Sequence, residues 1–352
     1  MERLDGTVRV ERLDGTVRVE RLDGTVRVER VEQVVRMDPL RGTLHVERPG
    51  SETGVTPGGL WTAGMSFVDE VVRAVGDRTP FGDPAVDRVT VGSDLVLVEV
   101  ADRADGSPDA PERAAGVAHR PPGPVPPVPD GADALAVGEW ARDPSRRSGE
   151  GDGSDDSGDR DSEGRTEWVG RALGLATLNA LSAPLIDWQR GDPFESIDPG
   201  VGVIATVGLF RPAFRKFGDV TVRVIEREPV SPPETPTGVT VETYPVEERA
   251  AALSGVGVLF VTGSSLVYGG VENYLAAADR IPTVVLVGAT ASFLPDPAFA
   301  AGVTTLAGVE VTDPGAVRAG IQGGACGTDL HGEGLRKGYV TAGEDAPGLD
   351  LE

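Results

Sequence analysis

The sequence is poor in the side chains that bind soft metal ions or form disulfides. It has one cysteine, Cys326, and three histidines in 352 residues. A single cysteine excludes a disulfide within the chain. Soft metals prefer several thiolate and imidazole ligands at short spacing. Only Cys326, Asp329 and His331 cluster in this way, so they are the metal-ligand candidates; the alternative is that their Gly-rich segment is a mobile tail.

Basic residues are also scarce, and only two of them, Lys216 and Lys337, are lysines. The chain carries 33 Lys and Arg against 56 Asp and Glu, which gives a formal net charge of −23. Acidic, lysine-poor composition is typical of proteins from salt-loving organisms, in which carboxylates keep the surface hydrated. Without a basic patch that could release counterions, we do not expect nucleic-acid binding.

Several sequence motifs are missing as well. No apolar run is long enough to span a membrane and no signal peptide is visible, so we expect a cytoplasmic protein without membrane contact. No Gly-x-Ser-x-Gly motif surrounds the serines at 264 and 265, which argues against a hydrolase triad. The Gly-x-Gly-x-x-Gly fingerprint of dinucleotide-binding folds is absent after the first strand of the second half.

The chain begins with repeats. Residues 2–28 are three identical copies of ERLDGTVRV, and a degraded fourth copy ends at Met37. The alternating residues and Asp-Gly turns are compatible with a β-hairpin array. Each copy offers few apolar side chains, however, so we expect residues 1–64 to be a disordered extension. Met65 opens a helix-like segment, and we expect it to be the native start of the protein.

The first half predicts an α+β domain over residues 65–190. Residues 65–76 form an amphipathic helix pattern. Three strands are predicted, at 87–91, 95–100 and 115–118. A Pro-rich and then Ser/Gly/Asp-rich stretch at 120–164 predicts a disordered acidic insert. Residues 168–185 give the strongest helix of this half.

The second half predicts a doubly wound parallel sheet, because short apolar runs alternate with helical stretches. A short helix is expected at 209–217. The strands are expected at 201–207, 220–225, 256–261, 283–287, and either 303–306 or 309–311. We therefore expect an α/β Rossmann-like domain over residues 200–325, followed by a Gly-rich polar tail at 326–352.

Such sheets bind ligands just beyond the carboxyl ends of their strands. Glu226 ends the second strand, where dinucleotide-binding folds carry a ribose-binding acid; an exposed carboxylate is the alternative interpretation. Thr262, Gly263, Ser264 and Ser265 follow the third strand and open a helix. Their hydroxyls and N–H groups could bind an anion, or they could form an ordinary helix cap.

Two further polar residues could belong to this site. Arg211 lies close to Gly208 at the end of the first strand and could bind an anionic ligand, or it could be a surface arginine. Asn179 is the one strongly polar residue in the apolar part of the 168–185 helix. A buried asparagine there would either satisfy neighbouring backbone groups or point into a site between the domains.

Several segments together resemble the proposed heavy-metal-chelation family of prokaryotic proteins. The resemblance covers residues 65–335, and its segments are VTVGS at 89–93, GLATLNAL at 174–181, VGLFRP at 207–212, VIEREP at 224–229, VTGSSLVYGGVENYL at 261–275 and LVGATASFLPDPAF at 286–299. It implies an enolase-N-terminal-like α+β domain followed by a Rossmann-like domain, with a site in the cleft between them. The sequence departs from the family pattern at Tyr268, Gly270, Ala289 and Thr290.

The resemblance also implies which residues line the cleft: Asn179, Gly208, Glu226, Thr262, Gly263, Ser264, Ser265, Gly288 and Thr290. The function it implies is heavy-metal chelation, or binding of a small anionic ligand or metal complex, and a metal ion or metal complex is the only cofactor implied. An enzyme that uses a nucleotide-type cofactor and a non-catalytic regulatory protein are the alternatives. No residue is assigned as catalytic, and the oligomeric state is left open.

Overall fold

The computed structural model describes residues 65–103, 111–142, 160–343 and 346–351, together with five strands between residues 8 and 47. The chain divides into two units, Met1–Thr56 and Pro57–Glu352. The second half of the expected acidic insert, residues 143–159, lies outside the described residues. All side-chain contacts given below belong to the second unit.

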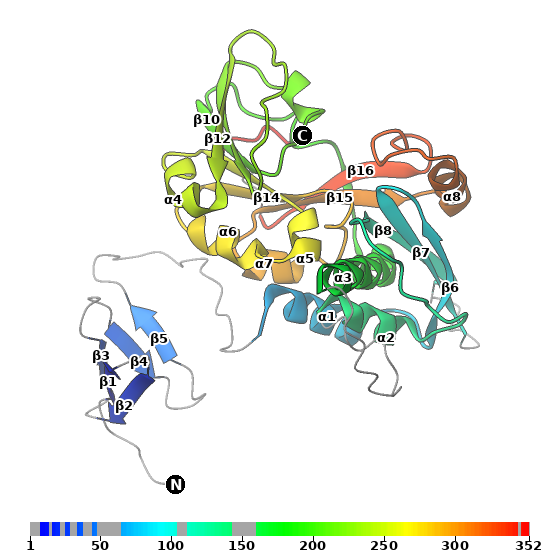
Figure 1. Ribbon diagram of the computed structural model, residues 1–352, viewed down its shortest axis with the longest axis horizontal. Coiled ribbons are helices and arrows are strands. Elements are labelled where there is room, and N and C mark those ends of the chain that lie inside the picture. The colour runs from blue at the N-terminus through cyan, green and yellow to red at the C-terminus, as the bar shows by residue number, and fades with distance from the viewer. Residues whose placement is uncertain are drawn as a thin grey trace. The chain divides into compact units, whose positions relative to one another are not determined.

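The first unit contains five short strands, four of them within the repeats (Figure 1). They are β1 (Val8–Leu13), β2 (Thr16–Arg21), β3 (Thr25–Val28), β4 (Val34–Met37) and β5 (Leu44–Glu47). The sheet order is β2-β1-β3-β4-β5. β1 and β2 are antiparallel, and Val10 pairs with Val19, the same position of the next repeat. The pairs β1–β2, β3–β4 and β4–β5 are antiparallel, as in the hairpin interpretation, whereas β1 and β3 are parallel. These strands lie where we expected disorder, and the rest of residues 1–64 lies outside the described residues.

A mixed sheet of eight strands forms the centre of the second unit (Figure 1). Its order is β12-β11-β10-β13-β14-β15-β16-β9, and β16 runs antiparallel to both neighbours while the strands from β12 to β15 are parallel. The strands are β9 (Gln189–Arg190), β10 (Val203–Val207), β11 (Val220–Glu226), β12 (Val239–Pro245), β13 (Val258–Thr262), β14 (Thr283–Val287), β15 (Thr305–Val311) and β16 (Leu335–Thr341). The parallel strands follow the order 3-2-1-4-5-6 of a Rossmann fold, which confirms the predicted doubly wound class.

Both faces of this sheet are buried, which explains why its strands are continuous apolar runs. Val284 and Leu286 of β14 belong to the core on one face, where the helices α5, α6 and α7 also pack. Val285 and Val287 belong to the core on the other face, with the aromatic side chains of the segment that follows β10. The helices are α4 (Arg249–Ala252), α5 (Ser264–Tyr268), α6 (Val271–Ala277), α7 (Asp296–Ala300) and α8 (Pro314–Gln322).

The first half folds as the predicted α+β domain around an antiparallel sheet, β6-β7-β8. Its elements are α1 (Phe67–Arg78), β6 (Pro84–Val91), β7 (Leu95–Asp102), β8 (Arg113–His119), α2 (Ala134–Gly138) and α3 (Arg160–Ser182). β7 is buried on both sides: Val96 and Val98 join the core with α1 and α3, whereas Leu95 and Leu97 join a core with α8 and β16. The two domains therefore share apolar contacts. No helix in the described residues is long and apolar enough to cross a membrane.

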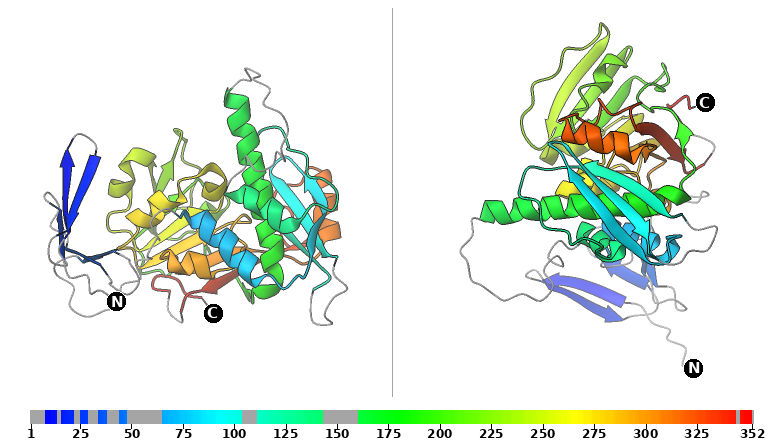
Figure 2. Two further views of the ribbon diagram at one scale, coloured as in Figure 1. Left: turned by 90° about the horizontal axis from the view of Figure 1, so that it is seen from below. Right: turned by 90° about the vertical axis from the view of Figure 1, so that its right-hand side faces the viewer.

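The long helix α3 lies directly on β8, and the green helix and cyan strands are seen side by side in Figure 2. Glycine permits this approach, because a Cβ on Gly116 would lie 2.3 Å from the backbone of Ala176 and of Ala180. Gly174 on α3 has a similar role, since its Cβ would lie 2.3 Å from the backbone nitrogen of Ala141. We call the contact between α3 and β8 the seam.

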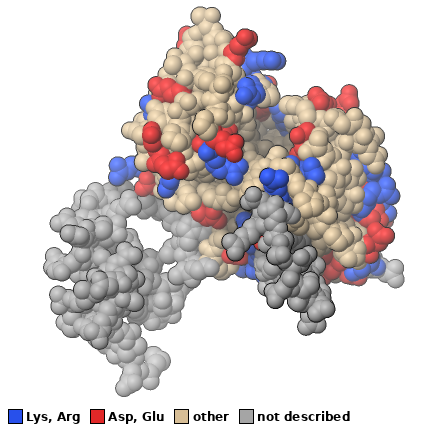
Figure 3. Space-filling view, in the orientation of Figure 1, with Lys and Arg blue, Asp and Glu red and all other residues tan. Residues whose placement is uncertain are grey.

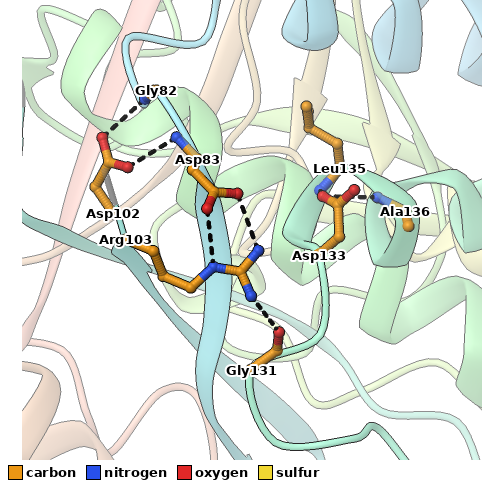
Figure 4. Close-up of polar contacts among 8 residues, drawn as sticks. All are labelled: Gly82, Asp83, Asp102, Arg103, Gly131, Asp133, Leu135 and Ala136. Carbon is orange, nitrogen blue, oxygen red and sulfur yellow. Dashed lines mark hydrogen bonds and ion pairs between the residues drawn. The ribbon is translucent and has the colours of Figure 1, made fainter. Parts of the chain in front are cut away.

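Part of the stretch at 120–164 that we expected to be disordered has regular structure instead, and residues 160–164 belong to α3. Residues 120–142 are described, and they contain α2 and a buried Trp140. Asp133 caps α2 by accepting from the N–H groups of Leu135 and Ala136, and Arg103 of the β6–β7 layer donates to the carbonyl of Gly131 at 2.8 Å (Figure 4). This segment packs on the domain because its scattered apolar residues contact other parts of the fold. Its Pro-rich composition does not predict these contacts.

The second half differs from the expectation in three places. Residues 209–217 form only a 3-10 turn at Ala213–Arg215 instead of a helix. β12 was not predicted, because its alternating polar residues form a half-exposed edge strand. The expected polar tail contains β16, in which Tyr339 is 2% exposed. The two alternatives at 303–306 and 309–311 both overlap one strand, β15, which begins at Thr305.

Candidate functional site

A cavity of about 290 Å³ opens at the carboxyl ends of β10, β11 and β13. From β10 the chain proceeds outward through β11 and β12, and it then returns to β13 on the other side of β10. The strand order therefore reverses between β10 and β13, and ligands of open α/β sheets bind at this reversal. We call this space the switch-point cavity. It is lined by Val207, Gly208, Leu209, Phe210, Ile225, Glu226, Arg227, Thr262, Ser264, Ser265, Tyr268, Gly269 and Tyr274.

Glu226 lies at the end of β11, as predicted, and contributes to the cavity wall. Its Oε1 accepts a hydrogen bond of 2.7 Å from the N–H group of Leu209, in the loop that follows β10. Gly208 opens this loop with a φ of 96°, and a Cβ there would lie 3.1 Å from Cγ2 of Thr262. The glycine thus allows the loop to approach β13. Among the described residues, Glu226 accepts a hydrogen bond only through Oε1, so its second carboxylate oxygen has no partner there.

The residues of the turn after β13 have two different roles. Thr262 and Ser264 line the cavity half-buried, with 3.0 Å between their hydroxyl oxygens. Ser265 also borders the cavity, but it is 6% exposed and its hydroxyl donates to the carbonyl of Thr262 at 2.6 Å. Gly263 donates its N–H to the carbonyl of Val287, so its role is to join β13 to β14. The hydroxyls of Thr262 and Ser264 are therefore the groups of this turn that a ligand can reach.

An aromatic and cationic wall completes the cavity. The guanidinium carbon of Arg227 lies 4.3 Å from the centre of the Tyr268 ring, and Arg227 is exposed. Behind it, the Tyr268 hydroxyl lies 3.0 Å from Nε2 of His119, and Trp168 contacts the Tyr268 ring edge-on. Burial raises the pKa of Tyr268 and lowers the pKa of His119, so the phenol is protonated and the imidazole is neutral at neutral pH.

Sequence reasoning did not identify Arg227 or Tyr268 as site residues. Arg227 directly follows Glu226 at the tip of β11, and this position beside a predicted site residue was a usable signal. Tyr268 was noted only as a departure from the family pattern. His119 and Trp168 come from the first domain, and nothing in the local sequence indicates that they back this wall.

Asn179 and Thr290 are not in the cavity lining; they lie in the seam and next to it. Asn179 is 1% exposed, and its amide nitrogen lies 2.8 Å from the carbonyl oxygen of Val117, 3.2 Å from that of Ala289 and 3.1 Å from that of Thr290. The hydroxyl of Thr290 accepts a 2.9 Å hydrogen bond from the N–H of His119. These bonds connect α3 and β8 to the loop after β14. Asn179 therefore satisfies neighbouring backbone groups and does not point into a site between the domains.

Two other candidates are also separate from this cavity. Gly288, with a φ of 127°, lines a second cavity on the other side of the loop after β10. Arg211 is exposed and lines neither cavity. Every lining residue of the switch-point cavity comes from the parallel-sheet domain, so it is not a cleft shared equally by both domains; the first domain supports only the wall behind Tyr268.

The metal-ligand candidates do not converge on one point. Asp329 accepts from the backbone N–H of Cys326 at 3.0 Å, and the Cys326 thiol lies 3.0 Å from the hydroxyl of Thr328. His331 lines the second cavity instead. Among the residues that the structure describes, no group of three or more His, Cys, Asp or Glu is arranged to hold a metal ion. Cys326, Asp329 and His331 therefore do not fit direct ligation of a soft metal ion as one group.

Comparison with known proteins relates part of this chain to a protein family. Residues 192–339 match the model of the DUF364 family, which is described as "Putative heavy-metal chelation". A DUF364 protein of unknown function from Pyrococcus horikoshii has a crystal structure with a TM-score of 0.58 and 19% identity, covering 79% of this chain and 100% of that chain. A second, from Desulfitobacterium hafniense, has a TM-score of 0.53 and 15% identity, covering 80% and 100%.

At these identities the two structures show the shared fold. No protein with a curated description matches the chain. Residues 192–339 of the chain are therefore similar to the DUF364 family, and these residues supply the whole lining of the switch-point cavity.

Proposed function

We propose that the chain binds a small hydroxylated anion, or a metal complex that presents such groups, in the switch-point cavity. One observation supports this most strongly: Glu226, Arg227, Thr262 and Ser264 line a single cavity at the point where the strand order reverses. A carboxylate accepts hydrogen bonds from ligand hydroxyls, and a guanidinium pairs with a carboxylate or phosphate. These four side chains are therefore suited to a molecule that carries both hydroxyl groups and a carboxylate or phosphate.

This proposal is compatible with the description of the family. Since the described side chains offer no metal-ligand cluster, a metal would enter as a complex whose ligands come from an organic chelator. The hydroxyl and carboxylate groups of such a chelator are the chemistry that Glu226, Arg227 and the Thr262–Ser264 pair can bind. The metal would then be cargo held through its chelator.

A nucleotide-type ligand is the second candidate, and the position of Glu226 favours it. Glu226 ends the second strand of a 3-2-1-4-5-6 sheet, where a carboxylate binds ribose hydroxyls in dinucleotide-binding folds. Against it, the loop after β10 has the sequence Gly-Leu-Phe-Arg-Pro-Ala in place of a Gly-rich phosphate loop. Ribose 5-phosphate shares the hydroxyl and phosphate groups of a nucleotide and is therefore a probe for both candidates.

Calorimetric titration with three simple probes tests the proposal. Ribose 5-phosphate should bind more tightly than inorganic phosphate, which lacks the ribose hydroxyls, and more tightly than ribose, which lacks charge. Glu226→Gln should remove the advantage over phosphate, and Arg227→Gln should remove the advantage over ribose. Ferric citrate serves as the metal-complex probe and Zn²⁺ as the bare-metal probe.

The matched control is Glu228→Gln, which removes an exposed carboxylate two residues from Glu226 and outside the cavity lining. It should leave all titrations as in the wild type. Binding of Zn²⁺ alone, with no response to ribose 5-phosphate or ferric citrate, would contradict the proposal. So would equal losses in Glu226→Gln and Glu228→Gln.

A further inference from the structure

The second cavity has a volume of about 250 Å³ and is lined by residues with chemistry of a different kind. Its walls come from the segment after β9, the 3-10 turn after β10, the end of β14, the middle of β15, the loop between α8 and β16, and β16 itself. Phe194, Phe210, Val287, Ala307 and Leu335 make most of the wall apolar. Binding cavities for drug-sized molecules are about 300–1,000 Å³, so this one fits a smaller ligand.

The two lysines of the chain meet at one edge of this cavity. Lys216 and Lys337 both donate to Oδ2 of Asp192, at 2.6 and 2.7 Å. All three residues line the cavity. Because they share one oxygen, the two ammonium nitrogens are at most 5.3 Å apart, the sum of these distances. All other basic residues apart from the histidines are arginines. On the face drawn in Figure 3, basic side chains lie beside acidic ones.

The two lysines carry two positive charges, whereas their buried acidic partner carries one negative charge. The Asp192 side chain is 9% exposed; burial alone would raise its pKa, but the hydrogen bonds from Lys216 and Lys337 lower the pKa below its ordinary value. One buried carboxylate thus faces two ammonium groups. Glu195 also contacts Lys216 at 2.7 Å, but its side chain is 63% exposed, and exposed pairs contribute little.

Each ammonium group has three N–H donors. The contacts among the described residues account for two donors of Lys216 and one of Lys337. An ammonium on a flexible stem can turn its remaining donors to a second anion without losing the first. The lysine pair is therefore able to accept one more carboxylate at the edge of the cavity.

His331 borders the same cavity and adds a polar group without charge. Its Nδ1 is buried and has no hydrogen-bond partner among the described residues. Burial first, and the nearby Lys337 next, lower the pKa of His331, so the ring is neutral at neutral pH. A buried polar atom without a partner is uncommon in folded proteins and often marks a position that a ligand or water completes.

We propose that this second cavity binds a small monocarboxylic acid with a compact apolar body. The carboxylate lies on Lys216 and Lys337, and the body lies among the apolar side chains around Phe194 and Val287. A single extra negative charge matches this pair, because Asp192 is the one buried carboxylate that faces it and Glu195, on Lys216, is exposed. A nucleotide or polyanion does not match, because most of this wall has no donors for further charged groups. The proposal is independent of the function proposed for the switch-point cavity.

Calorimetry on the full chain with benzoate, acetate and benzyl alcohol tests this proposal. Benzoate combines the anion with an apolar body, whereas acetate lacks the body and benzyl alcohol lacks the charge. We expect benzoate to bind one molecule per chain and more tightly than both other probes. In Lys337→Met, which keeps an apolar stem, the benzoate affinity should fall about tenfold or more, as for loss of a hydrogen bond to a charged group.

The matched control is Arg336→Met, because Arg336 is the preceding residue of β16, is paired with Glu310 and does not line the cavity. It should bind benzoate as the wild type does. No benzoate binding, equal binding of acetate or benzyl alcohol, or an equal loss in Arg336→Met would overturn the proposal. If circular dichroism shows that Lys337→Met does not fold, the comparison of the three probes on the wild type decides alone.

Discussion

The seam and the switch-point cavity both contain polar side chains that the sequence marks as candidate ligand groups, yet they use them differently. In the seam, Asn179 is buried and its amide nitrogen is near three backbone carbonyls. In the cavity, Glu226, Thr262 and Ser264 bond to neighbours through some of their atoms and also border open space. Polar groups in the seam thus serve stability, and those in the cavity are able to serve binding.

The largest loss of stability is expected in the seam, at a glycine where an added side-chain atom has no space. A Cβ on Gly116 would lie 2.3 Å from the backbone of α3, and helix backbone cannot yield without separating from β8. Gly116→Ala should therefore lower the free energy of unfolding by about 3 kcal/mol or more, the upper range for overpacking. Chemical denaturation measures this change.

The control is Gly76→Ala on α1, where an added Cβ would meet no atom within 4 Å. This variant should be neutral or more stable by up to about 1 kcal/mol, because alanine favours helix. If Gly116→Ala were as stable as Gly76→Ala, the seam would not be closely packed.

A smaller loss is expected for Asn179→Ala. The variant leaves the carbonyls of Val117, Ala289 and Thr290 without the amide, and unsatisfied buried groups cost about 1–3 kcal/mol. The affinity for ribose 5-phosphate should not change, since Asn179 does not line the switch-point cavity. Thr177→Val on the same helix, which removes one bond to the carbonyl of Leu173, should cost less. If Asn179→Ala lost affinity for ribose 5-phosphate without losing stability, the conclusion that Asn179 serves stability alone would be wrong.

Glu226→Gln should behave in the opposite way. Its amide oxygen can still accept from the N–H of Leu209, so the free energy of unfolding should change by less than about 1 kcal/mol. The affinity for ribose 5-phosphate should nevertheless fall about tenfold, because a neutral amide is a weaker acceptor for ribose hydroxyls than a carboxylate. Denaturation and calorimetry on the same samples check both halves. Large destabilisation with retained affinity would assign Glu226 to structure.

The smallest effect concerns His119, which connects the two regions. Its backbone N–H bonds to Thr290 and its ring contacts Tyr268 of the cavity wall. Burial lowers the pKa of His119 in the folded state, so the unfolded chain binds this proton more readily. Its contribution to stability is complete above the unfolded pKa and is lost as the pH falls from there toward the folded pKa.

The wild type should consequently lose more stability between pH 7.5 and pH 5.5 than His119→Gln, whose side chain does not titrate. Denaturation at several pH values measures the difference between the two slopes. The other histidine of the described domains, His331, is present in both proteins and cancels in this comparison. Identical slopes would mean that His119 has the same pKa folded and unfolded.

The sequence predicted those elements whose burial is uniform along the segment. β14 has the predicted bounds and β13 differs by at most two residues at its ends, because continuous apolar runs carry strong signals. The long apolar helix was also recognised, but α3 begins eight residues before the predicted start, in a polar stretch that gave no helix signal. β12 is half-exposed and β16 lies in a Gly-rich segment, so neither has such a run. Their pairing with β11 and β15 supplies what their own composition does not indicate.

For the site, the sequence located Glu226 and the turn at Thr262–Ser265 correctly at strand ends, because the rule for doubly wound sheets depends only on strand order. It could not separate Asn179 from these residues, since a polar side chain on an apolar helix has the same local sequence whether it meets backbone or ligand. Arg227 and Tyr268 were missed for a related reason: their contact joins the tip of β11 to the end of α5, 41 residues apart in the numbering.

By itself, the amino-acid sequence determined the fold class, the positions of the buried strands along the chain and the strand ends at which Glu226 and the Thr262–Ser265 turn lie, because periodicity and apolar runs are local properties. Only the tertiary structure decided which polar groups remain open, how the first domain supports Tyr268 through His119, and why the two lysines meet at Asp192. The physical reason is that solvation and partner choice depend on atoms that are close in space and distant along the chain.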